Sequence, residues 1–417
     1  MTFHKIKSSA MSSTTTSTQS YISLSFPDVC LLYPAFFALG FGKAIFYFPL
    51  FVVYYFLKLP SINDIRIQKN YFYFLVLIIY YIFFLFAIGA ERMTLDHPWR
   101  TFAAILFSIL ATGLILYRQN YNTNMALFSL YVFGLLCDSL LTIVYSAMQG
   151  DMYGYGRLIS PFNEEDFNSP GISNLLGLCF SFFYYIVIHK TDTSTLVRLF
   201  SAVVLFASVI AGIFLGGRTF FLICGLTVIF FMIFRSSIHT IILVVVCSIL
   251  MTAILYISIQ NYEPFFRDYE FIKLRFQEGL ESGRFELYSQ GLDALLIYPL
   301  GGSHAIGNKW FFNLFLDTAR VAGWLPLILF ILSMVPMLKA FYSKRKAPDS
   351  IILWWVFFLT LVVMSQEVII EGNPRVFTLF YISAAIILTG CDSFTRSANL
   401  FVKKSNPCIE SLICLER

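Results

Sequence analysis

Long apolar runs recur along this chain, and they restrict its fold more than any other feature. Each run is about 17 to 25 residues long, the length that a helix needs to cross a hydrocarbon layer of about 30 Å. Hydrophobic residues make up 58% of the 417 positions and charged residues only 13%, so the chain has too little polar surface for a soluble protein of this size. The sequence therefore predicts an all-α, polytopic integral membrane protein.

The apolar runs predict eleven or twelve membrane-spanning helices. The two counts differ only in residues 21–58. This region forms either one long span or, if "GFGK" at 40–43 breaks it, two shorter ones. The expected spans lie near 29–57, 71–90, 101–117, 126–147, 172–189, 196–215, 219–234, 239–258, 311–338, 350–370 and 375–391.

Basic residues between the spans predict the orientation, because cytoplasmic loops are enriched in lysine and arginine. Placing residues 58–69 in the cytoplasm puts most basic loops on the same side. Lys5 and Lys7 also lie in the cytoplasm only if residues 21–58 cross the membrane twice. This favours twelve spans with both termini inside. The other residues placed inside are Lys58, Arg66, Lys69, Arg118, Lys190, Arg235, Lys339, Lys344, Arg345, Lys346, Arg396, Lys403 and Lys404.

This orientation divides the chain into a few regions. We expect a disordered cytoplasmic tail over 1–20, a transmembrane bundle over 21–258, a large outer loop over 259–310, further transmembrane helices over 311–391 and a cytoplasmic tail over 392–417. The eight scattered cysteines show no metal-ligand spacing and support neither a disulfide framework nor a zinc site. We expect no metal and no cofactor. The net charge of +5 fits positively flanked spans and gives no sign of nucleic-acid binding.

The segment "FFNLFLDTARVAG" (311–323) carries three polar residues at the start of an apolar span. Asn313, Asp317 and Arg320 are spaced i, i+4, i+7 and share one helix face. A straight helix to residue 338 would bury Arg320 in the membrane, where a charge costs at least about 2.5–3.5 kcal/mol and needs a partner or a wet cavity. The residues are therefore either functional or a structural Asp317–Arg320 ion pair.

Two further segments place charge beside helix ends. In "FLGGRTFFLI" (214–223), Arg218 follows a double glycine and opens a helix, which suits an anion such as phosphate; a tight turn with a snorkelling arginine is the alternative. In "MSQEVIIEGNPRVF" (364–377), Glu367 and Glu371 share a face and can bind sugar hydroxyls or act as a base. A solvated helix end explains these carboxylates equally well.

The outer segments supply the remaining candidates. Residues 284–300, "RFELYSQGLDALLIYPL", repeat apolar side chains at helical spacing and predict a helix lying at the membrane interface. Arg284 opens this helix, and His304, after a glycine turn, suits proton transfer near neutral pH. Arg157, in the outer segment 148–171, is a further candidate for binding substrate.

Together these segments resemble the family of bacterial O-antigen polymerases and O-antigen ligases. The likeness lies in "GGRT" with Arg218, in "RFELYSQGLDALLIYPLGG" with Arg284, and in "FFNLFLDTARVAG", where Asn313, Leu316 and Gly323 match a family pattern "HN-x-x-L…G". The family's histidine falls on Phe312 here. Either His304 or a carboxylate, Asp317 or Glu371, would then be the base, and the missing histidine favours a polymerase over a ligase.

The resemblance implies a GT-C-like glycosyltransferase in the bacterial inner membrane with its active site facing the periplasm. Its substrates would be oligosaccharides on undecaprenyl diphosphate, and a chain-length regulator would be a partner. Of the matched residues, it implies that Arg218, Arg284 and Asn313 bind substrate, and we expect Arg157, Arg320 and Glu367 to bind substrate as well. A flippase for the same lipid-linked sugar is the alternative from another class, although the chain shows no internal repeat of the kind found in many transporters.

Overall fold

The structure is a computed structural model, and it describes residues 26–58, 76, 79, 98–118, 121–149, 157–162, 166–188, 190, 193–215, 217–235, 284–302, 310–344, 350–367 and 373–405. These residues are mostly helical, as the sequence predicted. Span 239–258, nearly all of span 71–90 and the first half of the predicted outer loop lie outside them.

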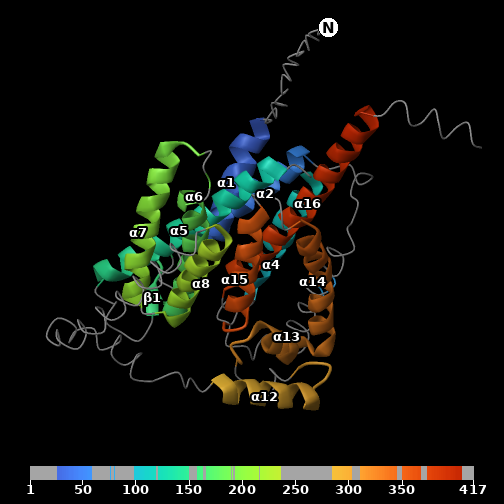
Figure 1. Cartoon of the computed structure of the whole chain (residues 1–417). Coiled ribbons are helices and arrows are strands. Elements are labelled where there is room, and N and C mark those ends of the chain that lie inside the picture. Colours follow the sequence, from blue (N-terminus) through green and yellow to red (C-terminus); the bar gives the residue numbers. More distant parts are fainter. Residues whose placement is uncertain are drawn as a thin grey trace, which may run out of the picture.

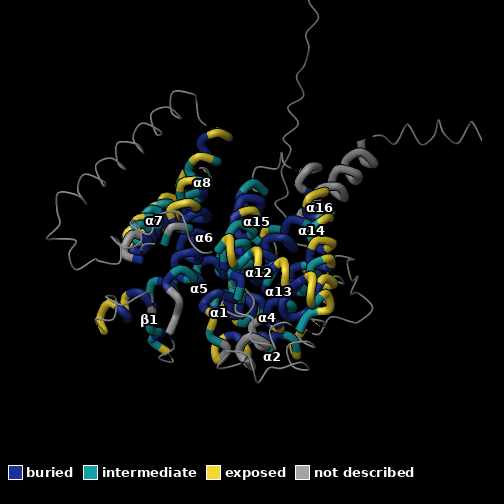
Figure 2. The backbone as a smooth tube through the Cα atoms, turned by 90° about the horizontal axis from the view of Figure 1, so that it is seen from below, coloured by how far each residue is buried: buried dark blue, intermediate teal, exposed yellow. Residues whose placement is uncertain are grey.

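Within the described ranges, three helices are long and apolar enough to cross a membrane: α5 (Tyr121–Gln149), α6 (Ser169–Ile188) and the stretch Thr195–Gly212 of α7 (Thr195–Leu215). Several of the other helices are apolar but shorter. Leu199 and Val203, four residues apart on α7, are 66% and 60% exposed, so one face of the helix is both apolar and exposed. Such a face suits contact with lipid. Figure 2 shows the exposed residues along α7.

The first predicted span is two antiparallel helices, the second of the two alternatives. A π-helical turn, η1 (Asp28–Leu32), leads into α1 (Tyr33–Phe41), and α2 (Ala44–Lys58) runs back beside it. Gly42 makes the turn in the left-handed conformation, at φ 78°, which glycine adopts readily. The Tyr54 hydroxyl donates to Asp28 across the hairpin at 2.9 Å.

The prediction of one helix over 311–338 was wrong, because the chain breaks at Gly323 into α13 (Leu314–Ala322) and α14 (Trp324–Lys344). Gly323 has φ 78°, and a Cβ there would lie 2.3 Å from the Pro299 carbonyl oxygen. The Trp324 N–H donates to that same oxygen at 3.0 Å. The segment that follows α12 (Arg284–Ile297) therefore fills the break between α13 and α14.

The core of the bundle is built around α5, α6 and α16 (Pro374–Ser405). Helix α1 packs on α5, α16 packs on α4 (Pro98–Arg118) and α15 (Ser350–Met364), and α6 lies beside α7 and α8 (Arg218–Arg235). Large side chains such as Tyr131 and Phe380 are fully buried there. Helix α16 continues to residue 405, past residue 391, where the sequence placed the end of the last span (Figure 1).

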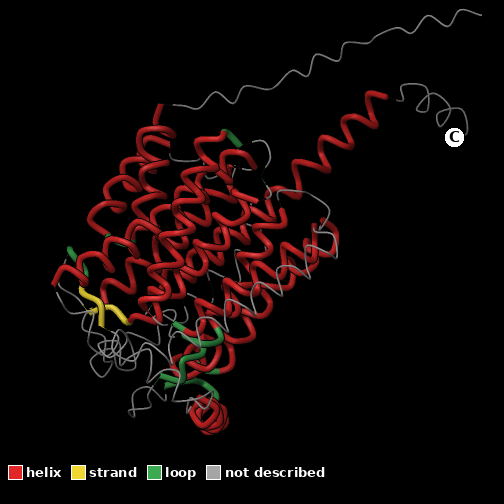
Figure 3. The backbone as a smooth tube through the Cα atoms, turned by 60° about the vertical axis from the view of Figure 1, so that its left-hand side comes forward, coloured by secondary structure: helices red, strands yellow, loops and turns green. Residues whose placement is uncertain are grey.

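One end of the bundle carries the short elements that connect the helices. Strands β1 (Arg157–Ile159) and β2 (Asp166–Asn168) form an antiparallel hairpin there, which the sequence did not predict. Helix α12 (Arg284–Ile297), which the sequence did predict, lies across the same end (Figures 1 and 3). We call this the loop end of the bundle; it also contains the turn Ser365–Glu367, to which the Tyr288 hydroxyl of α12 donates at 3.0 Å.

Candidate functional site

The turn Ser365–Glu367, at the end of α15, joins segments that are far apart in the sequence. The Ser365 carbonyl oxygen accepts hydrogen bonds from Tyr288 of α12 at 3.0 Å and from the Asn313 amide at 3.2 Å. The Gln366 side-chain oxygen accepts a hydrogen bond from Thr219, in the first turn of α8, at 3.1 Å. This turn thus connects three of the segments that the sequence singled out.

Glu367 is buried at this turn, with only 6% of its surface exposed. Its Oε1 accepts a hydrogen bond of 2.9 Å from Asn174 of α6, and the positive charge of Arg284 acts on it from α12. Burial raises the pKa of Glu367 from its ordinary 4.5 to about 7, while Arg284 and Asn174 both lower it. A carboxyl group with such a pKa exchanges protons readily near neutral pH.

Arg284 lies over an aromatic ring whose backbone is unusual. Its guanidinium carbon is 5.9 Å from the centre of the Phe312 ring. Phe312 has φ 54°, which makes it the sole non-glycine residue with positive φ among those described. A bulky side chain in this conformation stores about 1–3 kcal/mol, and such residues cluster at functional sites. Phe312 is also the position where the family pattern places its histidine.

Asn313 and Asp317 serve the local fold of α13. The Asn313 side-chain oxygen caps the helix by accepting from the N–H groups of Phe315 and Leu316 at 3.0 and 3.3 Å. The Asp317 carboxylate accepts from the N–H groups of Phe311 and Asn313 at 2.7 and 3.1 Å. These contacts give both side chains a structural role and leave fewer of their acceptor sites for a substrate.

Arg320 and Asp317 form the ion pair that the sequence suggested, with Arg320 Nε 3.9 Å from the carboxylate. The Arg320 guanidinium also lies 5.7 Å from the centre of the Trp310 ring. Because α13 ends at Ala322, Arg320 lies in the last turn of a short helix. The expectation that it lies deep within one long span was wrong, since the break at Gly323 separates it from α14.

The remaining predicted site residues are placed only in part. Arg157 begins β1 and Arg218 begins α8, both at the loop end. Gly217, next to Arg218, packs so tightly on α6 that a Cβ there would lie 1.8 Å from Ser173 Oγ. His304 and Glu371 lie outside the described residues.

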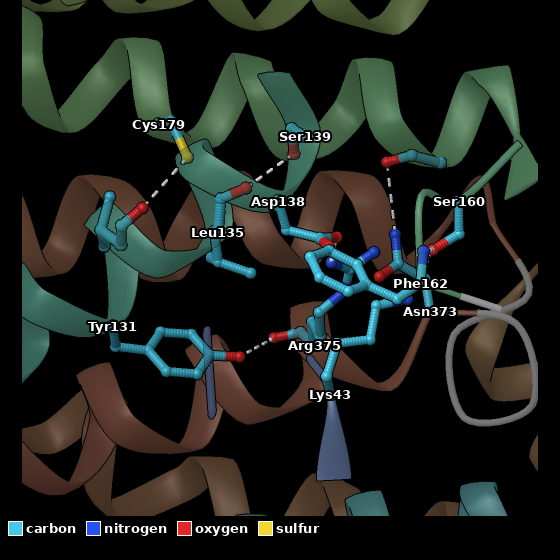
Figure 4. Close-up of polar contacts among 12 residues, drawn as sticks. Lys43, Tyr131, Leu135, Asp138, Ser139, Ser160, Phe162, Cys179, Asn373 and Arg375 are labelled. Atoms are coloured by element: carbon cyan, nitrogen blue, oxygen red, sulfur yellow. Dashed lines mark hydrogen bonds and ion pairs between the residues drawn. The ribbon is translucent and has the colours of Figure 1, made fainter. Parts of the chain in front are cut away.

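A second polar group at the loop end was missed by the sequence reasoning. Asp138 of α5, fully buried, forms an ion pair with Arg375 in the first turn of α16. The Tyr131 hydroxyl donates to the Arg375 carbonyl oxygen at 2.8 Å, and Lys43 lies beside the pair, 3.0 Å from Ser160 Oγ (Figure 4). The signal was present, because an ionisable residue inside the apolar run "LLCDSLL" is a functional candidate by default.

Three comparisons, with family models, with curated proteins and with solved structures, find no match to this chain. Fold and site together define a helical protein with membrane-length helices and a buried carboxylate, Glu367, at one end of its bundle. Of the predicted site residues, Asn313 donates to the turn that carries this carboxylate, and the positive charge of Arg284 acts on the carboxylate itself.

Proposed function

We propose that this chain is a membrane glycosyltransferase of the polymerase type. It would transfer a growing glycan from undecaprenyl diphosphate to an incoming repeat unit carried on the same lipid. The observation that carries the proposal is Glu367, a buried carboxyl group with a pKa of about 7 at the loop end of an apolar helix bundle. It accepts a hydrogen bond from Asn174 and is acted on by the charge of Arg284. The resemblance to O-antigen polymerases supplies the substrate class.

Glu367 acts as the general base in this proposal. Its ionised carboxylate takes the proton from a hydroxyl group of the acceptor sugar while the hydroxyl oxygen bonds to the anomeric carbon of the donor. The bond from that carbon to the diphosphate oxygen breaks, and its electron pair leaves with the lipid diphosphate. The sequence left Glu367 open as a ligand for sugar hydroxyls or as a base. Asp317 is equally buried, but its carboxylate accepts two backbone N–H groups and pairs with Arg320, which favours Glu367 as the base.

Cationic groups stabilise the negative charge that develops on the leaving diphosphate. Arg284 is the first of them, because it acts on Glu367 and so lies near the reacting groups. Arg218 is the second, because it begins α8, whose N–H groups favour an anion, and its neighbour Thr219 contacts the Glu367 turn. Arg320 pairs with Asp317 and contributes less.

The proposed location is the bacterial inner membrane, crossed many times, with the loop end facing the periplasm. The basic residues of the predicted cytoplasmic loops support this orientation. Activated lipid-linked sugars reach the enzyme at that face, so the reaction needs no nucleotide.

The test replaces Glu367 with glutamine, which keeps the shape of the side chain but removes the base. In a strain whose chromosomal copy is deleted, the wild-type gene should restore long surface glycan and Glu367→Gln should leave single repeat units. Glu286→Gln is the matched control, because Glu286 is an exposed glutamate on α12. It should restore long chains.

The deletion strain also separates the alternatives. Loss of a polymerase leaves single repeats on the surface, loss of a flippase leaves none, and loss of a ligase strands finished polymer on the lipid carrier. The role of the arginines has its own test, in which Arg218, Arg284 and Arg320 are replaced singly by alanine. Normal long chains in all three variants would rule out their contact with the diphosphate.

A further inference from the structure

Two buried asparagines beside the Glu367 turn each use the amide NH₂ group in a hydrogen bond but leave the amide oxygen without one. Asn174 donates through Nδ2 to Glu367 at 2.9 Å, and Asn373 donates through Nδ2 to the Gly171 carbonyl oxygen at 3.3 Å. The two residues are 1% and 6% exposed. Within the described parts of the chain, neither Oδ1 atom has a hydrogen-bond partner.

The orientation of both amides follows from their contacts. Glu367 is ionised when it acts as the base, and an ionised carboxylate, like a backbone carbonyl, only accepts hydrogen bonds. In that state the NH₂ group of each asparagine must face its partner. Flipping either amide would place two oxygens together. The unused atoms are therefore carbonyl oxygens, and each is an acceptor that needs a donor.

The two amides lie close to each other along α6. Asn373, just before α16, contacts Gly171, and Asn174 is three residues further along the same helix. Residues three apart share a helix face, so both amides face the side of α6 that is turned toward Glu367 and the start of α16. The Ser173 hydroxyl, buried and without a described partner, lies next to Asn174 on the side of Gly217.

The chemistry of these oxygens selects one part of a lipid-linked sugar. Amide oxygens repel a phosphate group and attract hydroxyl or N–H donors. Leaving a buried acceptor unpaired costs free energy, which a ligand with hydroxyl groups would recover. The Asn174 amide already touches the carboxylate that we propose as the base, so a sugar bound to its oxygen would have a hydroxyl group within reach of Glu367.

We propose that the carbonyl oxygens of Asn174 and Asn373 form the subsite for the acceptor sugar and bind hydroxyl groups next to the one that reacts. This inference rests on the proposed function, and it separates the sugar from the diphosphate, which the arginines bind. Both oxygens are closed to solvent in this structure, so neighbouring side chains must shift as the sugar enters.

The experiment compares binding of two lipids to the full-length protein in lipid nanodiscs. One is the lipid-linked repeat unit extracted from the deletion strain, and the other is undecaprenyl diphosphate without sugar. Asn174→Leu and Asn373→Leu should each weaken binding of the repeat unit about tenfold, the effect of losing a buried hydrogen bond. Binding of the sugar-free lipid should stay within about twofold of wild type.

The outcomes are distinguishable. Equal weakening for both lipids, or no weakening for either, would overturn the sugar subsite while leaving the proposed function intact. A wild-type protein that binds the repeat unit no better than the sugar-free lipid would instead count against the proposed function itself. If the leucine variants do not fold, Asn174→Ala and Asn373→Ala remove the same oxygens without adding bulk and are judged by the same two affinities.

Discussion

Asp138 and Arg375, 237 residues apart, form an ion pair that joins the middle of α5 to the first turn of α16 inside the helix bundle. Asp138 is fully buried, and the Arg375 side chain is 13% exposed. The Arg375 stem packs against Gly42, where a Cβ would lie 2.9 Å from Arg375 Cδ. The pair thus fixes three elements, the α1–α2 turn, α5 and α16, at the loop end (Figure 4).

Breaking this pair on one side should destabilise the protein strongly. Asp138→Leu or Arg375→Met each leaves a buried charge without its partner, which costs about 3–5 kcal/mol. The double variant removes both charges and should recover most of the loss. The measurement is unfolding in detergent, with Lys190→Met as a surface control that should change stability by less than about 0.5 kcal/mol. A double variant as unstable as the sum of the two single variants would show that the charges do not interact.

The pH dependence of polymer synthesis should follow the ionisation of Glu367. A general base works when ionised, and the pKa of Glu367 is about 7. The rate should therefore be low at pH values below about 7, where the carboxyl group is protonated, and should rise as the pH passes through about 7. Arg284→Met removes a charge that lowers this pKa, so the midpoint of the profile should move to higher pH. The measurement is the initial rate in nanodiscs between about pH 5.5 and 8.5, a range that brackets a group poised near neutrality. If the midpoint does not move in Arg284→Met, the group that titrates in the rate profile is not Glu367.

Part of this site could be predicted from the sequence. Glu367 and Arg284 stand out as charged residues beside long apolar runs, and the helix that begins at Arg284 has the expected apolar spacing. The burial of Glu367 could not be predicted, because it depends on Asn174, 193 residues earlier in the chain. An asparagine within "GISNLLGL" carries no local pattern that reveals its partner.

In the fold, too, features with a local sequence signal could be predicted, whereas contacts between distant segments could not. The break at Gly323 had a local signal, since "GWLP" places a glycine and then a proline where a helix commonly ends and another begins. The treatment of residues 311–338 as one span followed hydropathy alone, which does not respond to a single glycine. The close approach of Gly323 to Pro299 depends on the path of the segment that follows α12, which the sequence does not define.

Gly217 should tolerate no side chain, because α6 passes directly against it. A Cβ there would lie 1.8 Å from Ser173 Oγ and 2.6 Å from Ser173 Cβ, so Gly217→Ala should destabilise the protein by about 1–3 kcal/mol. Adding Ser173→Ala should relieve part of this loss, and adding Ser173→Gly should relieve more. Unfolding in detergent gives the order of the three variants. The same loss in all three would place the strain elsewhere.

Gly40 and Gly134 should be equally intolerant, because they let α1 and α5 cross in close contact. A Cβ on Gly40 would lie 2.0 Å from the Tyr131 carbonyl oxygen, and one on Gly134 would lie 2.1 Å from the Phe37 carbonyl oxygen. Both obstacles are backbone atoms, which cannot rotate away, and small residues at such crossings are typical of membrane helices. Gly40→Ala and Gly134→Ala should therefore each destabilise the protein by about 1–3 kcal/mol.

The control for this prediction is Gly225, a glycine of α8 where an added Cβ would meet no neighbouring atom within 4 Å. Gly225→Ala should stabilise the protein by roughly 0.5–1 kcal/mol, because alanine favours a helix interior over glycine. Each of the three alanine variants adds one methyl group to the native chain. If the change stabilises the protein at Gly225 but destabilises it at Gly40 and Gly134, the loss at Gly40 and Gly134 comes from the close contact of α1 and α5 and not from helix propensity. A stabilising effect at Gly40 or Gly134 would mean that α1 and α5 are farther apart than the structure places them.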